Sequence, residues 1–235
     1  MKVKDKYLNF YYETIGEVPE PVIDPAKTAL LIIDMQNQFV RRDSPEAEAF
    51  KAAGEWERWI PFHDRLDETV IPNNVKLLEY FRKQNMTVTY AQIACLREDG
   101  EDRSPVQKSE GWNGIFLPIN NPETQIIDEL TPRKNEIVVS KTTDSVTTGT
   151  NYLTLLNFMG IETVVVTGIV TDQCVACSVR GLADAGYRVI CVEDACAAGS
   201  MELHDAELKI MSVIYCDVLS TDETIGLIEK NTDKP

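Results

Sequence analysis

An acid, an amine and a thiol each follow a short apolar run of this chain. Asp34 follows TALLII (28–33), Lys141 follows EIVVS (136–140), and Cys174 ends the segment GIVTDQC, which comes after ETVVVT (162–167). A thiolate is a strong nucleophile, a nearby ammonium favours its charged form, and a carboxylate can accept the thiol proton. Each residue alone has an ordinary structural explanation, as a turn cap, a surface charge or a core thiol. Together they predict a nucleophilic site.

The elements that must position these residues alternate along the chain. Strands are predicted at 28–33, 86–94, 136–140, 162–167, 188–193 and 214–219, and helices at 73–84, 122–130, 148–159, 172–185 and 202–212, with a short tail helix after them. The strands are continuously apolar, which is typical of a parallel sheet that is covered on both faces. The sequence therefore predicts an α/β fold, a doubly wound, Rossmann-like six-stranded parallel sheet with helices on both faces.

The predicted fold brings the three reactive residues together. Ligands bind beyond the carboxyl ends of the strands in an open parallel sheet, and Asp34, Lys141 and Cys174 all lie at that edge. Cys174 also lies in the first turn of a predicted helix, whose N-terminal partial charge favours a thiolate. Backbone N–H groups in the loop before it can stabilise a developing oxyanion.

Composition limits the partners of the chain. The 235 residues carry a formal net charge of −15, and the acidic residues are scattered, so neither nucleic acid nor an anionic membrane is an expected partner. The opening MKVKDKYLNFYYE has no apolar core of a secretory signal. No run approaches the roughly 20 apolar residues that span a bilayer. We expect a cytoplasmic protein.

Other uses of the cysteines remain open. Cys174 and Cys177 form a C-x-x-C motif, so a thiol redox protein is one alternative. A non-catalytic binding module on the same fold is another. A zinc site is disfavoured, because the two histidines, His63 and His204, have no ligand-like spacing. The sequence also contains no G-x-G-x-x-G motif for a dinucleotide.

Three segments resemble the isochorismatase-like cysteine hydrolases, a family that includes nicotinamidases and the N-carbamoylsarcosine, ureidoacrylate and biuret amidohydrolases. These segments are LLIIDMQNQF (30–39), VVSKTTDSVTTGT (138–150) and TGIVTDQCVACSVRGLADAGYRVICVEDAC (167–196). The resemblance implies that Asp34, Lys141 and Cys174 are the catalytic residues. It also implies a cis peptide at Ile169–Val170, with the backbone N–H groups of Val170 and Cys174 as the oxyanion hole.

Departures from the family pattern narrow the expected substrate. Nicotinamidases carry histidine metal ligands near the pocket, whereas AQIACLREDG (91–100) contains none, and Cys174 argues against the vinyl-ether cleavage of isochorismatases proper. Gln92 looks like the glutamine of ureidoacrylate-type enzymes. Val146 and Thr147 stand where the family commonly has a bulky aromatic residue.

We therefore expect one hydrolase domain over 1–235, with the insertion 41–72 as a lid or oligomer contact. The expected activity is metal-independent and cofactor-free hydrolysis of a C–N bond in a small linear amide, carbamoyl or ureide substrate, through a thioester on Cys174. Phe39, Gln92 and Trp112 are candidate substrate-binding residues. The resemblance also implies a homo-oligomer, a dimer or a tetramer.

Overall fold

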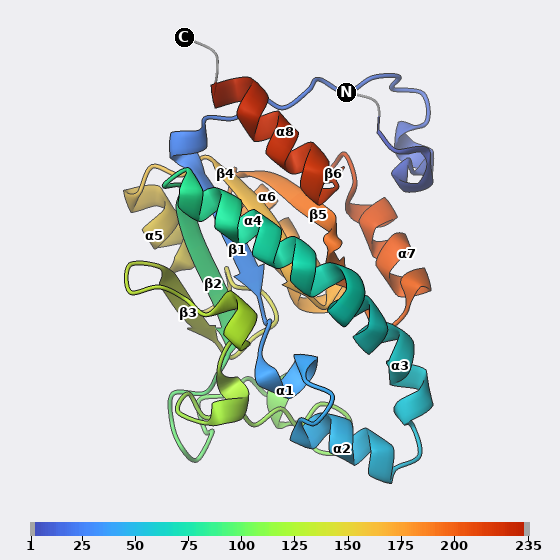
Figure 1. Ribbon diagram of the computed structural model, residues 1–235, viewed down its shortest axis with the longest axis vertical. Helices are drawn as coiled ribbons and strands as arrows, with labels where there is room; N and C mark the ends of the chain where they lie inside the picture. The colour runs from blue at the N-terminus through green and yellow to red at the C-terminus, as the bar shows by residue number, and fades with distance from the viewer. Residues whose placement is uncertain (1–2, 233–235) are drawn as a thin grey trace.

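The computed structural model describes residues 3–232 and is organised around one six-stranded sheet in the order β3-β2-β1-β4-β5-β6 (Figure 1). Every pairing between neighbouring strands is parallel. The strands are β1 (Thr28–Ile33), β2 (Thr87–Ile93), β3 (Ile137–Lys141), β4 (Thr163–Ile169), β5 (Arg188–Ala197) and β6 (Asp217–Leu219). The predicted parallel α/β sheet is confirmed.

Strands β1 and β4 form the centre of the sheet. They pair in register from Thr28 opposite Thr163 to Ile33 opposite Gly168, and every residue of both strands is buried. From β1 the chain adds β2 and β3 on one side, and from β4 it adds β5 and β6 on the other. The crevice at this switch point is where open α/β sheets bind ligands.

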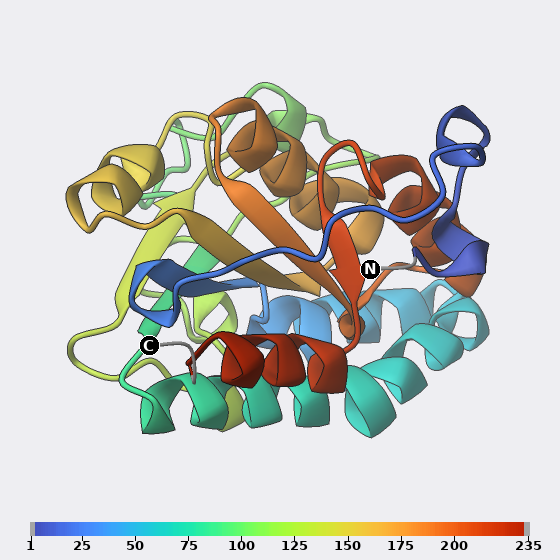
Figure 2. The same ribbon diagram turned by 90° about the horizontal axis from the view of Figure 1, so that it is seen from above.

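Helices cover both faces of the sheet (Figure 2). Helices α5 (Tyr152–Phe158), α6 (Ala176–Asp184) and α7 (Met201–Met211) pack on one face, and α4 (Ile71–Lys83) and α8 (Thr221–Thr232) pack on the other. Alternate residues of β1 pack against the two helix layers. Leu31 packs with α5, α6 and α7, and Leu30 packs with α4 and α8. This division explains why the strand is apolar throughout.

The segment 41–72 is helical, although no helix was predicted there. It contains α2 (Pro45–Ala52), α3 (Trp56–Arg65) and a π turn, η4 (Leu66–Val70), which leads directly into α4, while α1 (Asn37–Val40) precedes it. Helix α4 therefore begins before the predicted start at residue 73. In Figure 1, α3 and α4 form one continuous rod along the sheet.

Several shorter elements differ from the predicted ones. The helix expected at 122–130 is two separate 3-10 turns, η6 (Pro122–Thr124) and η7 (Asp128–Leu130), because Gln125 between them is extended. Helix α5 begins at Tyr152 rather than at 148, since Gly149 has a positive φ of 72°, which a right-handed helix does not allow. The remaining short turns are η1 (Asp5–Tyr7), η2 (Phe10–Tyr12), η3 (Pro25–Lys27), η5 (Val106–Lys108) and η8 (Thr171–Val175).

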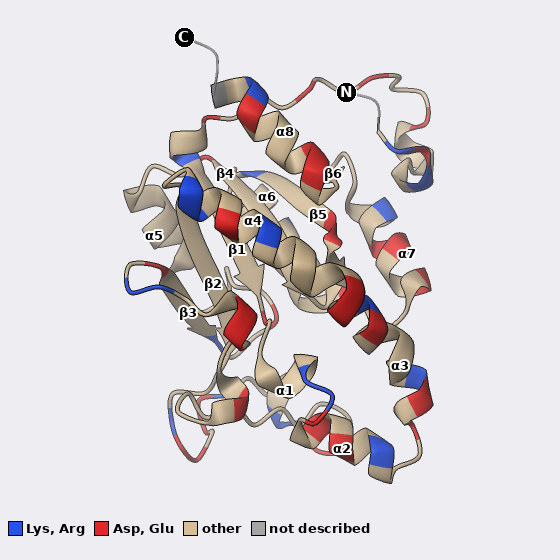
Figure 3. Cartoon of the chain, viewed as in Figure 1, with Lys and Arg blue, Asp and Glu red and all other residues tan. Residues whose placement is uncertain are grey.

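Acidic and basic side chains are interspersed over the helices rather than separated into faces (Figure 3). Among residues 3–232, no helix is both long and apolar enough to cross a bilayer.

Candidate active site

Asp34, Lys141 and Cys174 meet at the carboxyl edge of the sheet. Asp34 directly follows β1, with a positive φ of 52°, and its N–H donates to Ala91 O of β2 at 2.9 Å. Lys141 is the last residue of β3. Because β2 lies between β3 and β1, only a long side chain can reach Asp34 from this position. Its Nζ lies 2.8 Å from Asp34 Oδ2 and 3.4 Å from Cys174 Sγ.

The Lys141 ammonium has a full set of acceptors. Besides Asp34 and Cys174, it donates to Thr143 O at 3.2 Å, which matches its three N–H donors. The side chain is completely buried, and burial disfavours the ammonium, but Asp34 and Cys174 together outweigh this effect and raise the Lys141 pKa above its ordinary value. Lys141 is therefore a fixed buried cation.

Burial keeps the Cys174 thiol protonated at rest. The thiol is 5% exposed, and burial, followed by the charge of Asp34, raises its pKa well above the ordinary value despite the opposing effect of Lys141. This direction is opposite to the one expected from the position of Cys174 at the start of a helix. A base must therefore remove the proton when the sulfur attacks.

Asp34 has an oxygen free for that proton. Its Oδ1 is buried and has no hydrogen-bond partner among the residues that the structure describes. Burial raises the pKa of Asp34, and the neighbouring Lys141 opposes the rise. The carboxylate is thus paired through one oxygen and unpaired through the other.

The backbone around the nucleophile is tightly constrained. The Ile169–Val170 peptide is cis, and Val170 O accepts hydrogen bonds from the N–H groups of Gln173 at 3.1 Å and Val175 at 3.2 Å. Gly168, with φ of 111°, lies against β1, where an added Cβ would be 2.1 Å from Ile33 O. Only glycine fits this close approach. Cys174 itself lies in the π turn η8, which continues into α6.

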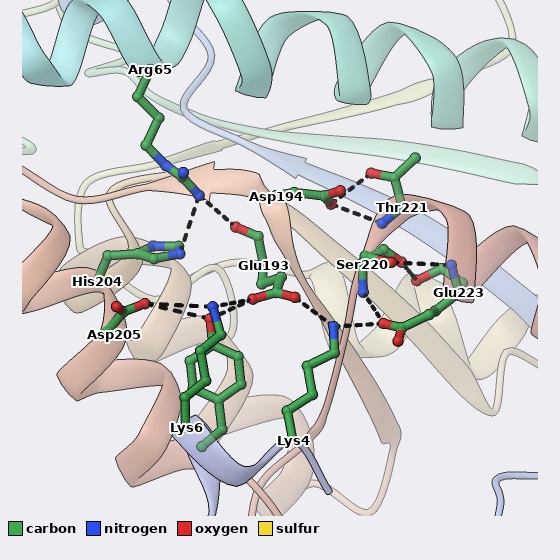
Figure 4. Close-up of polar contacts among 12 residues, drawn as sticks. Lys4, Lys6, Arg65, Glu193, Asp194, His204, Asp205, Ser220, Thr221 and Glu223 are labelled. Carbon is green, nitrogen blue, oxygen red and sulfur yellow. Dashed lines mark hydrogen bonds and ion pairs between the residues drawn. The ribbon is translucent and has the colours of Figure 1, made fainter. Parts of the chain in front are cut away.

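A second polar cluster joins Arg65, His204 and Glu193 (Figure 4), and His204 also contacts the η8 turn. Thr171 Oγ1 is 2.8 Å from His204 Nδ1, and Arg65 lies 3.3 Å from the other ring nitrogen while donating to Glu193 O at 2.9 Å. Burial, with the charge of Arg65, lowers the pKa of His204 to about 4. His204 is therefore a neutral packing residue and not a base near neutral pH.

Glu193 connects this cluster to the N-terminal segment. Lys4 and Tyr7 both donate to its carboxylate, and Lys6 Nζ lies 2.9 Å from it (Figure 4). These contacts hold residues 4–7 against the middle of β5.

A cavity of about 780 Å³ opens onto Asp34 and Cys174. Phe39 and Trp112, two of the predicted substrate-binding residues, line it, with Trp112 74% exposed at the wall. Gln92, the third, does not line it, and its amide instead donates to Ser140 Oγ at 3.2 Å on β3.

Other residues that were not predicted also line the cavity. Asp144 Oδ1 lies 3.9 Å from Cys174 Sγ. Asp144 comes three residues after Lys141, in a segment that resembles the family, and this position could have indicated that it lies at the site. Glu46, Phe50, Trp59 and Phe62 come from α2 and α3, where no pattern predicted a role. Cys177 is a free, exposed thiol, in contrast to the buried Cys174.

The Isochorismatase domain model matches residues 28–223. The chain therefore belongs to the isochorismatase family of hydrolases. The ureidoacrylate amidohydrolase RutB of Agrobacterium fabrum (strain C58) is 30% identical over 198 residues, which cover 77% of this chain and 81% of that protein. An uncharacterized isochorismatase family protein of Bacillus subtilis (strain 168), YrdC, is 26% identical over 85% of this chain and 95% of its own length.

Solved structures show the same fold. A cysteine hydrolase from Pseudomonas syringae pv. phaseolicola 1448A has a TM-score of 0.75 at 23% identity and covers 90% of this chain and 97% of that chain. N-carbamoylsarcosine amidase from Thermoplasma acidophilum has a TM-score of 0.62 at 25% identity, with coverages of 83% and 97%.

Proposed function

We propose that this protein is a cysteine amidohydrolase that cleaves the C–N bond of a small linear amide, carbamoyl or ureide substrate. The observation that carries the proposal is the contact of one buried ammonium, Lys141 Nζ, with both the Asp34 carboxylate and the Cys174 sulfur. Similarity to a ureidoacrylate amidohydrolase and to an N-carbamoylsarcosine amidase supports the amide class.

In the first half-reaction, Asp34 takes the Cys174 proton while the sulfur bonds to the substrate carbonyl carbon. The carbonyl oxygen becomes an oxyanion, which Lys141 and the N–H groups of Val170 and Cys174 stabilise. The tetrahedral species collapses as its C–N bond breaks, and Asp34 passes its proton to the departing nitrogen. Ammonia or an amine leaves, and the acyl group remains as a thioester on Cys174.

In the second half-reaction, Asp34 takes a proton from water as the water oxygen bonds to the thioester carbon. The C–S bond breaks, the acid is released, and the sulfur recovers its proton from Asp34. The protein residues supply every proton transfer, so we expect turnover without a metal ion or other cofactor.

The high thiol pKa fits this scheme. Because Cys174 is neutral at rest, the negative charge of the oxyanion forms only during the attack, beside a cation already in place. A preorganised charge of this kind stabilises the transition state without reorganisation.

An ammonia-release screen over linear amides, carbamoyl compounds and ureides tests the proposal, with Cys174→Ala as the blank. We expect at least one compound to release ammonia with the wild-type protein and none above background with the variant. Cys177→Ser is the matched control and should retain full activity. Equal turnover by Cys174→Ala would refute the proposal.

A further inference from the structure

One acidic side chain lies in an aromatic part of the cavity wall. Helix α2 contributes Glu46 and Phe50, and α3 contributes Trp59 and Phe62. The rings of Phe50 and Trp59 stack at 4.5 Å, and Phe62 meets Trp59 edge-on at 5.7 Å. Aromatic faces attract cations through the ring quadrupole, most strongly where water is excluded.

Glu46 has no counter-ion of its own. No described residue forms a hydrogen bond or ion pair with it, whereas Glu48 on the same helix pairs with Lys51 at 2.7 Å. Burial alone raises the pKa of Glu46 to about 7. An unpaired carboxylate in apolar surroundings is costly, so its presence in this wall calls for a partner from outside the chain.

The rest of the cavity is also acidic. Among residues 3–232, its charged or ionisable lining residues are Asp34, Glu46, Asp144, Asp172 and Cys174, with no Lys or Arg. Asp172 Oδ1 is buried without a partner among the described residues. Lys141 is buried beside Asp34 and does not line this cavity. A substrate carboxylate would find no free cation on this wall, whereas a positively charged nitrogen would find carboxylates and ring faces.

We propose that Glu46 and the rings of Phe50, Trp59 and Phe62 form a specificity subsite for a cationic nitrogen, and that the substrate is an amide with an alkylammonium group at its far end. The inference rests on the proposed amidohydrolase function, which it makes more specific. Glu46 neutralises the charge of the ammonium, and the rings contact its alkyl groups.

A matched compound series tests this subsite by binding. Three primary amides share each spacer length and end in trimethylammonium, the isosteric neutral tert-butyl group, or carboxylate. Isothermal titration with Cys174→Ala avoids turnover. We expect the cationic amide to bind about tenfold more tightly than the neutral one, with the anionic amide weakest.

The variant Glu46→Gln, in the same Cys174→Ala background, should bind the cationic and neutral amides equally. Glu48→Gln is the matched control on α2 and should leave the preference unchanged. The inference would be overturned if the protein showed no preference for the cationic amide or bound none of the compounds. It would also be overturned if Glu46→Gln and Glu48→Gln reduced that preference equally.

Turnover of the same compounds separates this inference from the proposed function. If the wild-type protein binds the cationic amide through Glu46 but releases no ammonia, the hydrolase proposal is contradicted and the binding site stands. If it hydrolyses the neutral or anionic amide with equal efficiency, the hydrolase proposal stands and the cationic subsite is wrong.

Discussion

Lys141 and Asp34, at the ends of strands that are not neighbours, form a buried ion pair of 2.8 Å. The lysine also contacts Cys174 Sγ, at 3.4 Å, and the charge of Asp34 acts on the same thiol. The pair therefore places a positive charge and a potential base on either side of one thiol. Several consequences can be measured.

The two members of the pair should shift the Cys174 pKa in opposite directions. The charge of Asp34 raises that pKa and Lys141 lowers it, although burial is the largest cause of the overall rise. Asp34→Asn should therefore lower the pKa and Lys141→Met should raise it, while both variants lose turnover. The pH dependence of thiolate absorbance, measured in a Cys177→Ser background, checks this. Shifts of the same sign would contradict the assigned roles.

Removing one partner of the ion pair should cost more stability than removing both. Lys141→Met leaves the buried Asp34 carboxylate without its cation, and we expect a loss of about 3–5 kcal/mol in the free energy of unfolding. The double variant Asp34→Asn, Lys141→Met should recover part of that loss. Urea unfolding of the single and double variants gives the coupling. A double variant that loses the sum of both single effects would show that the pair is not coupled.

Glu46 should make the protein less stable at higher pH. Its pKa is about 7 in the folded protein against an ordinary 4.5, so its ionisation opposes folding. The penalty is complete above pH 7 and disappears as the pH falls toward 4.5. Glu46→Gln should therefore raise the unfolding free energy by about 2 kcal/mol at pH 8, less than the full shift implies because some solvent reaches the side chain.

The difference in unfolding free energy between Glu46→Gln and the wild type should be smaller at pH 5 than at pH 8. Other groups titrate in both proteins, so their effects cancel in this comparison. Urea unfolding at both pH values measures it. A gain that is equal at pH 5 and pH 8 would point to packing rather than ionisation.

Gly168 should not accept even the smallest side chain. A Cβ there would lie 2.1 Å from Ile33 O and 2.6 Å from Ile33 N, both backbone atoms that cannot move aside. We expect Gly168→Ala to lose about 3 kcal/mol or more of stability or to fail to fold. Gly226→Ala, at a helical glycine with open space around it, is the control and should be stable. Comparable urea midpoints for the two variants would contradict this prediction.

The sequence predicted the fold and the reactive cluster because both depend on strand order. Apolar runs identify strands, and the residue after each run must lie at the carboxyl edge, which is why Asp34 and Lys141 could be placed without coordinates. The family-like segments added the cis peptide at Ile169–Val170, which the structure contains.

The cavity wall could not be predicted in the same way. Glu46 and Trp59 come from the segment 41–72, for which no helix was predicted, and their position depends on how α2 and α3 fold over the sheet edge. Gln92 was predicted to bind substrate because of the family resemblance, but its amide donates to Ser140 and it does not line the cavity. The predicted homo-oligomer stays a prediction.

The most direct test of the central claim, that Cys174 carries the acyl group, is rapid-quench intact-mass spectrometry during turnover of a substrate found in the ammonia screen. The Cys177→Ser variant is used so that the nearby thiol of Cys177 cannot carry the adduct in place of Cys174. We predict a mass increase equal to the acyl group, mapped to Cys174 and absent from Cys174→Ala. Turnover without any such adduct under single-turnover conditions, or an adduct on another residue, would contradict the account.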